Sequence, residues 1–448
     1  MKKHLLTRAS VLAGVLFSSA LAPTAFGQSS DAIIDKLVDK GILTQQEAKE
    51  LREEADHAFA RAHAAKTGLP DWVAQMRIGG DIRGRAEHFI SENTANVDRT
   101  RYRYRMRLGV TITMLDNVEA GLRLSSSEPS ASFGGDPISG NTTFSGNGSK
   151  KFVYLDLAYG KWTPINSGGL TLSGTVGKME NPFVVSDMVF DGDYTPEGAA
   201  LQASYQLNDH HTLKFNGAGF VLNELSGLRA DTFMFGAQAR WDGKYLQREG
   251  YYLIESALGA SWYGINTAGS LTNGAVPNVN VGNTRGGGSN PLAYNYNPVV
   301  IDAALTYHLP GMPLYNGVFP VKLAGEYMHN PAAPNNNTGW WMGVQFGKAG
   351  KRRTWEVGYR FKHLEADAWY EEFVDSDFGA YYQAGQTGGA SGYRAGTNVE
   401  GHIFKASYSP YDSLTFAVTY FMTDLINPSP AGSKSGMGRL QVDANWKF

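Results

Sequence analysis

Strict two-residue alternation over residues 99–114 is the feature that most constrains this chain. The segment reads RTRYRYRMRLGVTITM: the odd positions from Arg99 to Arg107 are all arginine, and from Tyr102 onward the even positions are aromatic or apolar. Successive side chains of a β-strand point to opposite faces, so this period predicts a strand with one charged and one apolar face. In a soluble sandwich the apolar face would meet a second sheet. In a membrane barrel it would meet lipid, and the arginines would line a water-filled interior. The run alone does not choose between a soluble sandwich and a membrane barrel.

Composition removes several classes of protein. The chain has 448 residues, no cysteine and a formal net charge of -2. Charged residues make up 18% and aromatic residues 12%, whereas soluble domains contain about 25% charged residues. The lack of cysteine excludes disulfides, thiolate metal sites and thiol nucleophiles. A near-neutral balance gives no reason to expect nucleic acid as a partner.

Residues 1–27 have the form of a secretory signal peptide. Lys2, Lys3 and Arg8 precede an apolar stretch, and the small residues Ala25 and Gly27 mark a cleavage site after position 27. We therefore expect export through the Sec pathway. No later apolar run reaches the roughly 18 residues of a spanning helix, so any membrane residence must be through strands.

Residues 28–75 hold the one region with helical spacing. Thr44 and Glu47 form a capping box, and Ala48, Leu51 and Ala55 begin a seam of mostly small side chains. We expect a short periplasmic helical segment. It is either an amphipathic hairpin at the end of a barrel or a short trimeric coiled coil, although about three heptads of mostly alanine bury little area.

Residues 76–448 consist of alternating segments of about ten residues, and we count about sixteen of them. Their connections alternate between tight turns, such as Asp116-Asn117, and long polar stretches, such as 128–149. Outer-membrane barrels have short turns at one rim and long loops at the other, and a soluble sandwich has no reason for this parity. The expected fold is all-β: a transmembrane antiparallel β-barrel of about sixteen strands with a short N-terminal α-helical leader.

The last segment has the form of an assembly signal for the barrel-assembly machinery. Apolar residues alternate toward the end of the chain and include Trp446 and Phe448. The aromatic girdles of such barrels place residues of this kind at the membrane interface. The expected surroundings of 76–448 are therefore outer-membrane lipid.

The arginines of this barrel must face the lumen. Arginine facing lipid at the membrane centre costs roughly 2 to 4 kcal/mol, so a register slip that turned five arginines outward is not tolerated. The predicted basic wall of the pore consists of Arg83, Arg85, Arg99, Arg101, Arg103, Arg105, Arg107 and Arg123.

The third long loop, residues 181–196, differs from the other loops. Its sequence, NPFVVSDMVFDGDYTP, combines apolar side chains with acids. Apolar residues in a loop need a surface to pack against, and the inner wall of the barrel offers one. Folded inward, the loop would narrow the lumen and set its acids across from the arginine wall; the alternative is an external loop with a small hydrophobic patch. The predicted constriction residues are Asp187, Asp191, Asp193 and Glu197.

Catalytic and metal chemistry find little support. No GxSxG motif occurs, and we predict no catalytic residue, no metal site and no cofactor. The acids of 371–377 are interpreted as a solvated charge run of an outer loop rather than as a weak Ca²⁺ site. The arginines would favour anions such as phosphate or carboxylates, but acids predicted to face inward are spread around the wall. An anion-selective channel and a structural protein that contacts the cell wall therefore stay as alternatives to general diffusion.

Several segments resemble the putative porin family of Gram-negative outer-membrane β-barrels. They are DKLVDKGILTQQEAKELREEA, IGGDIRGRAEHF, RTRYRYRMRLGV, GKMENPF with FDGDYTPEGAALQ, SDFGAYY with TNVEGH, and NWKF. The resemblance implies an outer-membrane barrel of sixteen strands that assembles as a homotrimer. It also implies passive diffusion of small hydrophilic solutes and ions, without naming a solute. The Gly- and Ala-rich stretch 382–394 departs from the family pattern and has the look of an expanded outer loop.

Overall fold

The computed structural model divides into two compact units, Met1–Ala74 and Gln75–Phe448. Within the first unit, Leu37, Glu47, Ala48 and Leu51 are helical. The predicted signal peptide and most of the predicted helical leader lie outside the described residues, so both stay predictions. In the described part of the chain, no helix is long and apolar enough to cross a membrane. The structure describes these four residues and 69–94, 96–130, 134–224, 227, 231–271, 281–286, 291–382, 392–428 and 434–448.

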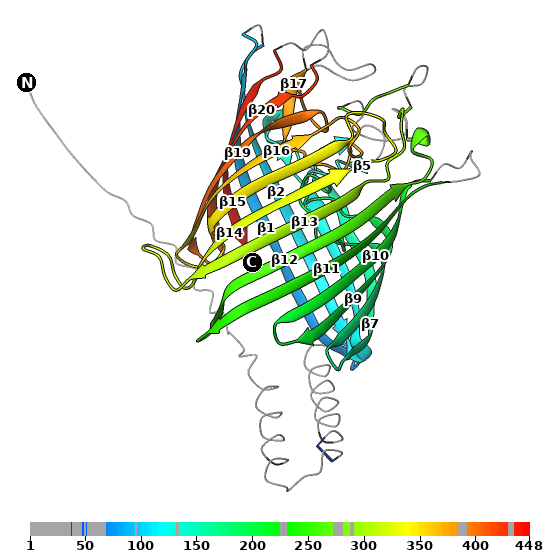
Figure 1. Ribbon diagram of the computed structural model, residues 1–448, viewed down its shortest axis with the longest axis vertical. Coiled ribbons are helices and arrows are strands. Elements are labelled where there is room, and N and C mark those ends of the chain that lie inside the picture. The colour runs from blue at the N-terminus through cyan, green and yellow to red at the C-terminus, as the bar shows by residue number, and fades with distance from the viewer. Residues whose placement is uncertain are drawn as a thin grey trace, which may run out of the picture. The chain divides into compact units, whose positions relative to one another are not determined.

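The second unit is a closed antiparallel barrel (Figure 1). Its sheet has 17 strands; without the two-residue β6, sixteen form the wall, as the sequence predicted. The last strand pairs with the first, with Gly84 opposite Ala444, and this pairing closes the barrel. The wall strands are β1 (Val73–Ser91), β2 (Arg99–Met114), β3 (Val118–Ser126), β7 (Val153–Ser167), β8 (Leu170–Lys178), β9 (Glu197–Asn208), β10 (His211–Asn223), β11 (Thr232–Arg248), β12 (Tyr251–Ile265), β13 (Val299–Leu309), β14 (Phe319–His329), β15 (Thr338–Gly347), β16 (Thr354–Leu364), β19 (Val399–Tyr411), β20 (Leu414–Leu425) and β21 (Met437–Lys447).

The two faces of the wall differ as alternation requires. On β2, Tyr102 is 56% exposed and Arg103 only 6%, because the tyrosine points away from the barrel and the arginine into it. The outer face is apolar on every side. A lone barrel in water would leave this surface unpaired, whereas lipid covers it. Examples of outward residues are Leu122, Leu201, Phe215, Leu258, Leu305, Leu323, Met342, Val357, Phe416 and Val442.

The connections follow the expected parity. Successive strands meet in tight turns at one end, such as η1 (Leu115–Asn117), where Asp116 adopts φ 64°. The other end carries the long loops, which include 179–196 and 365–398. The lengths of the connections do not follow this parity strictly, since the turn 310–318 is at least as long as the loop 330–337. Short elements within the long loops are β4 (Pro129–Ser130), β5 (Gly134–Gly135), β6 (Thr142–Thr143), η2 (Gly146–Gly148), η3 (Ala268–Ser270), β17 (Gly379–Tyr382) and β18 (Gly392–Ala395).

The main hydrophobic cluster lies inside the barrel rather than between two sheets. It joins loop residues such as Phe190 and Trp369 with strand residues such as Phe220 and Tyr263. All four side chains are at most 4% exposed. The loops therefore have a folded core of their own, which uses the ends of the wall strands as its support.

Candidate functional site

The third loop, residues 181–196, folds into the lumen and packs on the wall. The ring of Phe183 lies 5.1 Å from that of Tyr263 on β12, and Phe190 lies 5.3 Å from the same ring. A Cβ on Gly236 of β11 would lie 2.5 Å from an atom of the Phe183 ring, so only glycine permits this close approach. Met188 and Val189 are fully buried. The apolar residues of the loop thus find their partners on the inner wall.

Polar contacts fix the same loop to β11 and to one further strand, β14. The carbonyl oxygen of Val184 accepts hydrogen bonds from Gln238 Nε2 (2.9 Å) and Arg240 Nη1 (3.0 Å), both on β11. The backbone N–H of Ser186 donates to Glu326 Oε2 on β14 (3.1 Å). Backbone groups of a loop that leaves water need such partners, and strand side chains supply them here.

Asp187 binds two cations on β16. Arg360 Nη2 lies 2.5 Å from Asp187 Oδ2, and Lys362 Nζ lies 3.1 Å from Oδ1. Burial alone would raise the pKa of Asp187, but the charges of Arg360 and Lys362 overcome it and hold that pKa below its usual range. Asp187 is therefore ionised at neutral pH and ties the loop to the wall.

Asp193 lies against the arginine strand instead of across the pore from it. Its Oδ1 is 2.8 Å from Arg105 Nη1 and 3.6 Å from Arg107 Nη1. The sequence suggested loop acids on one side of the lumen and arginines on the other. The structure differs, because the carboxylate can lower its desolvation cost by direct pairing with the guanidinium groups.

Asp191 and Glu197, the other two predicted constriction acids, have different surroundings. Asp191 accepts backbone N–H groups from Asp193 and Ser376, each at 2.8 Å. Burial, then repulsion by Asp193 and Asp375, raises the pKa of Asp191 well above its ordinary value. Glu197 is the exposed first residue of β9 and lies 3.1 Å from Lys178 Nζ.

A second loop enters the lumen, and the sequence analysis missed it. We call residues 365–398 the seventh loop; its described residues 365–378 pack on the third loop. Trp369 Nε1 donates to the carbonyl oxygen of Val189 (2.9 Å), and Asp191 N–H donates to that of Phe373 (2.6 Å). The Asp375 N–H donates to the carbonyl oxygen of Asp187 (2.9 Å). The two loops form one folded unit.

Three of the four acids of residues 371–377 are buried and Asp377 is half-buried, so their interpretation as a solvated charge run is wrong. Glu371 is 1% exposed and accepts the N–H of Asn283 (2.7 Å). Asp377 lies 2.8 Å from both Arg85 Nη1 and Arg439 Nη2. Burial opposes its ionisation, but these arginines hold the pKa of Asp377 well below its ordinary value. Each acid is tolerated because a donor faces it.

The missed loop does carry a sequence signal. Residues 369–378 read WYEEFVDSDF, which combines aromatic residues with acids in the manner of the third loop. The same argument, that apolar residues in a loop need a wall, applies to both segments. The length of the loop and its Gly-rich second half concealed this signal.

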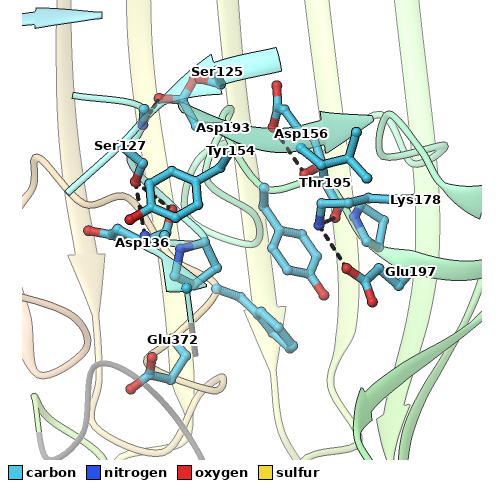
Figure 2. Close-up of a pocket in the computed structure, with 18 of the residues that line it drawn as sticks. Ser125, Ser127, Asp136, Tyr154, Asp156, Lys178, Asp193, Thr195, Glu197 and Glu372 are labelled. Atoms are coloured by element: carbon cyan, nitrogen blue, oxygen red, sulfur yellow. Dashed lines mark hydrogen bonds and ion pairs between the residues drawn. The ribbon is translucent and has the colours of Figure 1, made fainter. Parts of the chain in front are cut away.

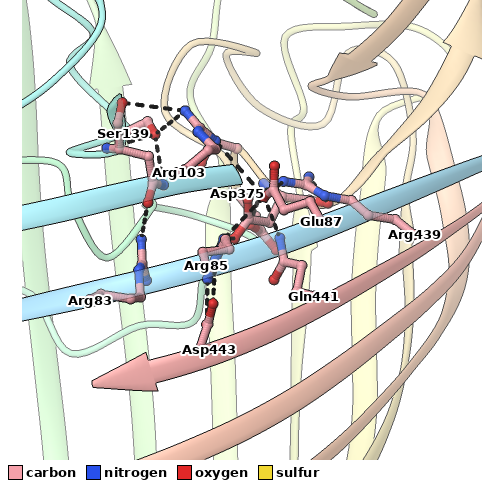
Figure 3. A network of polar contacts seen from close by, with 12 residues as sticks. Arg83, Arg85, Glu87, Arg103, Ser139, Asp375, Arg439, Gln441 and Asp443 are labelled. Atoms are coloured by element: carbon pink, nitrogen blue, oxygen red, sulfur yellow. Dashed lines mark hydrogen bonds and ion pairs between the residues drawn. The ribbon is translucent and has the colours of Figure 1, made fainter. Parts of the chain in front are cut away.

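The predicted basic wall is largely neutralised (Figure 3). Arg85 Nε lies 2.7 Å from Asp443 Oδ1, Arg105 and Arg107 share Asp81, and Arg123 pairs with Asp156. Arg101 pairs with Glu87, which is also 3.9 Å from Arg103.

Arg83 donates to the amide oxygen of Asn141 (2.6 Å) rather than to a carboxylate. Arg99 is exposed at the first position of β2, at the rim.

Three cavities of the lumen surround the two loops. The vestibule cavity, about 480 Å³, lies toward the long loops and is lined by Tyr154, Thr195 and Glu372 among others (Figure 2). The turn-end cavity, about 510 Å³, includes Asp81 and Lys447. Arg107 and Arg123 line both of these cavities and so mark the place where they adjoin.

The third cavity, about 550 Å³, lies beside β14 to β21 and is called the side cavity here. Asp187, Asp375 and Asp377 of the two loops line it, together with Lys322 and Lys405 of the wall. Loop carboxylates thus border this chamber, and it shares Thr415 and Asn445 with the turn-end cavity.

Of the predicted assembly residues, Trp446 lies on the last strand and Phe448 directly follows it. Trp446 is 45% exposed on the outer face. The backbone N–H of Phe448 donates to Gly80 O (3.1 Å), and its carbonyl oxygen accepts the N–H of Gly80 (3.0 Å). The last residue therefore continues the pairing between β21 and β1.

A closed barrel with an apolar outer face, a charged lumen and inward loops defines a membrane channel. The model of the family described as "Putative porin" matches residues 91–262 and 302–448. The chain belongs to this family and is an outer-membrane porin, a channel for passive diffusion. Porins are channels rather than enzymes. A comparison with curated proteins finds no match.

Three solved structures are similar to this chain. OprB of Pseudomonas putida has 13% sequence identity and a TM-score of 0.50, with 86% of this chain and 97% of that chain covered. DcaP of Acinetobacter baumannii has 11% identity and a TM-score of 0.44, with 84% and 97% covered. A mutant of the Rhodopseudomonas blastica porin has 10% identity and a TM-score of 0.41, with 84% and 100% covered. At these identities the likeness to OprB concerns the fold alone.

Proposed function

We propose that this porin is a general diffusion channel, and that small hydrophilic solutes and ions of either charge pass it on the side of β2 and β3. The observation that carries the proposal is the junction of the vestibule and turn-end cavities at Arg107 and Arg123. On the other side, Asp187 and Asp375 border the side cavity and belong to the packed loop unit. The third and seventh loops then act as a partition that leaves one route open.

Weak charge selectivity follows from the pairing of charges along this route. Arg107 contacts Asp81 at 2.7 Å, and Arg123 pairs with Asp156. A solute that passes the junction therefore meets arginine cations and aspartate anions at the same depth of the pore. Selectivity in pores depends on the charges that line the narrow section, so neither sign of ion gains a large advantage.

Bilayer recordings test the channel and its route together. Single-channel conductance and reversal potential in a KCl gradient are measured for the wild type, Arg123→Gln and Lys405→Gln. Both variants remove one cation, but Lys405 pairs with Glu356 and lines the side cavity. Arg123→Gln should shift the reversal potential toward cation preference by more than Lys405→Gln does. A larger shift for Lys405→Gln would place the route on the other side.

Anion selectivity is the second candidate function, and Arg83 is the observation that favours it. Its guanidinium faces an amide oxygen and also lines the side cavity. A bound anion there would make the KCl current fall as phosphate is added at low concentration. Strong anion preference with such saturation would replace general diffusion. A chain that inserts but conducts no current would instead support a structural role at the cell wall.

Export, assembly and oligomeric state complete the proposal. The signal peptide of residues 1–27 would direct Sec export, and Trp446 with Phe448 would present the last strand to the barrel-assembly machinery. Phe448→Ala should then lower the amount of folded protein in outer membranes. A homotrimer should show three times the protomer mass by light scattering in detergent after subtraction of the micelle.

A further inference from the structure

Lys362 is a buried cation between the two inward loops. It lies on β16 near the start of the seventh loop, and its side chain is 1% exposed. Its Nζ is 3.1 Å from Asp187 Oδ1 of the third loop and 3.1 Å from Asp375 Oδ2 of the seventh loop. A buried lysine is favourable only where anions or acceptors surround it, and here one carboxylate comes from each loop.

The ring of Phe378 covers the same ammonium group. Lys362 Nζ lies 4.2 Å from the centroid of this ring, within the range of a cation–π interaction. Phe378 is 1% exposed and belongs to a second hydrophobic cluster with Val399 and Phe421 of the wall. Lys362 therefore contacts the seventh loop at both Asp375 and Phe378.

The neighbouring cations have narrower roles. Arg360 Nη2 pairs with Asp187 of the third loop and its guanidinium lies over the ring of Trp341 on the wall. Arg85 and Arg439 pair with Asp377 of the seventh loop. Lys362 differs from these arginines, because its ion pairs, among those of the described residues, join one side chain of the wall to both loops.

We infer that Lys362 is the positioning residue that keeps the third and seventh loops closed against β16 and thereby sets the cross-section of the channel. This inference rests on the proposed diffusion function. Without the ammonium group, the buried carboxylate of Asp375 and the half-buried carboxylate of Asp187 would lie close to each other, and like charges in that setting repel. The loops would then move apart or away from β16 and open the side cavity to solutes.

The first test compares Lys362→Met with Lys405→Met in planar bilayers. Each variant removes one lysine charge from the barrel wall, but Lys405 lines the side cavity and pairs with Glu356 of the neighbouring strand instead of with a loop. Lys362→Met should raise single-channel conductance at least about twofold, since a wider section carries more ions. It should also admit larger polyethylene glycols in liposome-swelling assays. Lys405→Met should match the wild type in both assays.

A pair of loop variants separates loop opening from general damage to the fold. Asp375→Lys places a cation beside Lys362 and should open the channel as Lys362→Met does. The double variant Lys362→Met/Asp375→Lys returns a cation to the neighbourhood of Asp187, so its conductance should move back toward the wild-type value. General damage would instead make the double variant at least as open and noisy as either single variant, and that result overturns the inference.

Folding is checked by heat-modifiable migration in gels, which reports the intact barrel. If Lys362→Met does not fold, the loop variant Asp375→Lys decides: wild-type conductance and size limit in that variant overturn the inference. Wild-type protein that inserts without conducting refutes the proposed function itself. A conducting wild type whose Lys362→Met variant is folded but unchanged refutes the positioning role of Lys362 alone.

Discussion

Arg439 on β21 and Glu87 on β1 form an ion pair of 2.6 Å in which neither side chain has any exposed surface. The two strands are the last and the first of the barrel, so this pair lies at its closing seam. Arg439 Nη2 also contacts Asp377 of the seventh loop at 2.8 Å. The pair therefore connects barrel closure to the docking of a loop.

Arg439→Leu should be strongly destabilising. Removal of one partner from a buried ion pair costs about 3 to 5 kcal/mol, and here Glu87 and Asp377 would each lose one of the arginines that face them. Urea unfolding of the porin in detergent, followed by tryptophan fluorescence, measures the loss. Lys178→Met breaks the pair with Glu197, whose side chain is 65% exposed, and should cost no more than about 1 kcal/mol. Equal losses would show that the seam pair has no special role.

Acid should increase the anion preference of the channel without releasing the loops. The pKa of Asp191 is raised by burial, Asp193 and Asp375, and that of Asp375 is raised by burial with Asp187 and Asp377 opposing Lys362. As pH falls, both carboxyls therefore take up a proton at a pH above 3.8, the ordinary pKa of an aspartate. The folded state favours the protonated forms of Asp191 and Asp375. Their contribution to the stability of the fold is therefore present below the ordinary pKa and fades as pH rises through the raised pKa.

Asp187 and Asp377 behave in the opposite way, since their pKa values are lowered. Their contribution is present above the ordinary pKa and is lost only as pH falls through the lowered values, so the loops stay anchored in mild acid. Reversal potentials measured between pH 7 and pH 4 should move toward anions with little change in conductance. The variant Asp191→Asn/Asp375→Asn should show a smaller shift; an undiminished one would assign it to other carboxyls.

The barrel was predictable because the two-residue period recurs along 76–448 and because the connections alternate between short turns and long loops. Alternation in 99–114 specifies both faces of β2, and lipid leaves no other register for its arginines. The pairing of those arginines was not predictable, since Asp81, Asp193 and Asp443 reach them from distant parts of the chain. Such partners depend on how the barrel closes and how the loops fold, and strand periodicity carries no information on either.

Phe190→Ala should loosen the loop unit while the barrel stays folded. Phe190 is 4% exposed and its ring contacts those of Tyr263, Trp369 and Phe373. Truncation of a buried phenylalanine costs about 3 to 5 kcal/mol, and here the loss falls on the docked loops. Proteinase K should cleave the loops of the folded variant faster than those of the wild type. Val184→Ala, at a 51% exposed position of the same loop, should leave the cleavage rate unchanged.

Two adjacent positions of β14 test the assignment of the two faces. Leu323 is 55% exposed on the outer face, whereas Ala324 lines the side cavity. Leu323→Lys places an ammonium group in lipid and should cost roughly 2 to 4 kcal/mol. Ala324→Lys directs the same group into a wet, mixed-charge lumen, as the native Lys322 two residues earlier does, so its cost should be small. Unfolding by urea from lipid vesicles compares the two variants. If Ala324→Lys were the more destabilising, the inward face of β14 would be assigned to the wrong side, and with it the lumen position of Glu326 and Lys322.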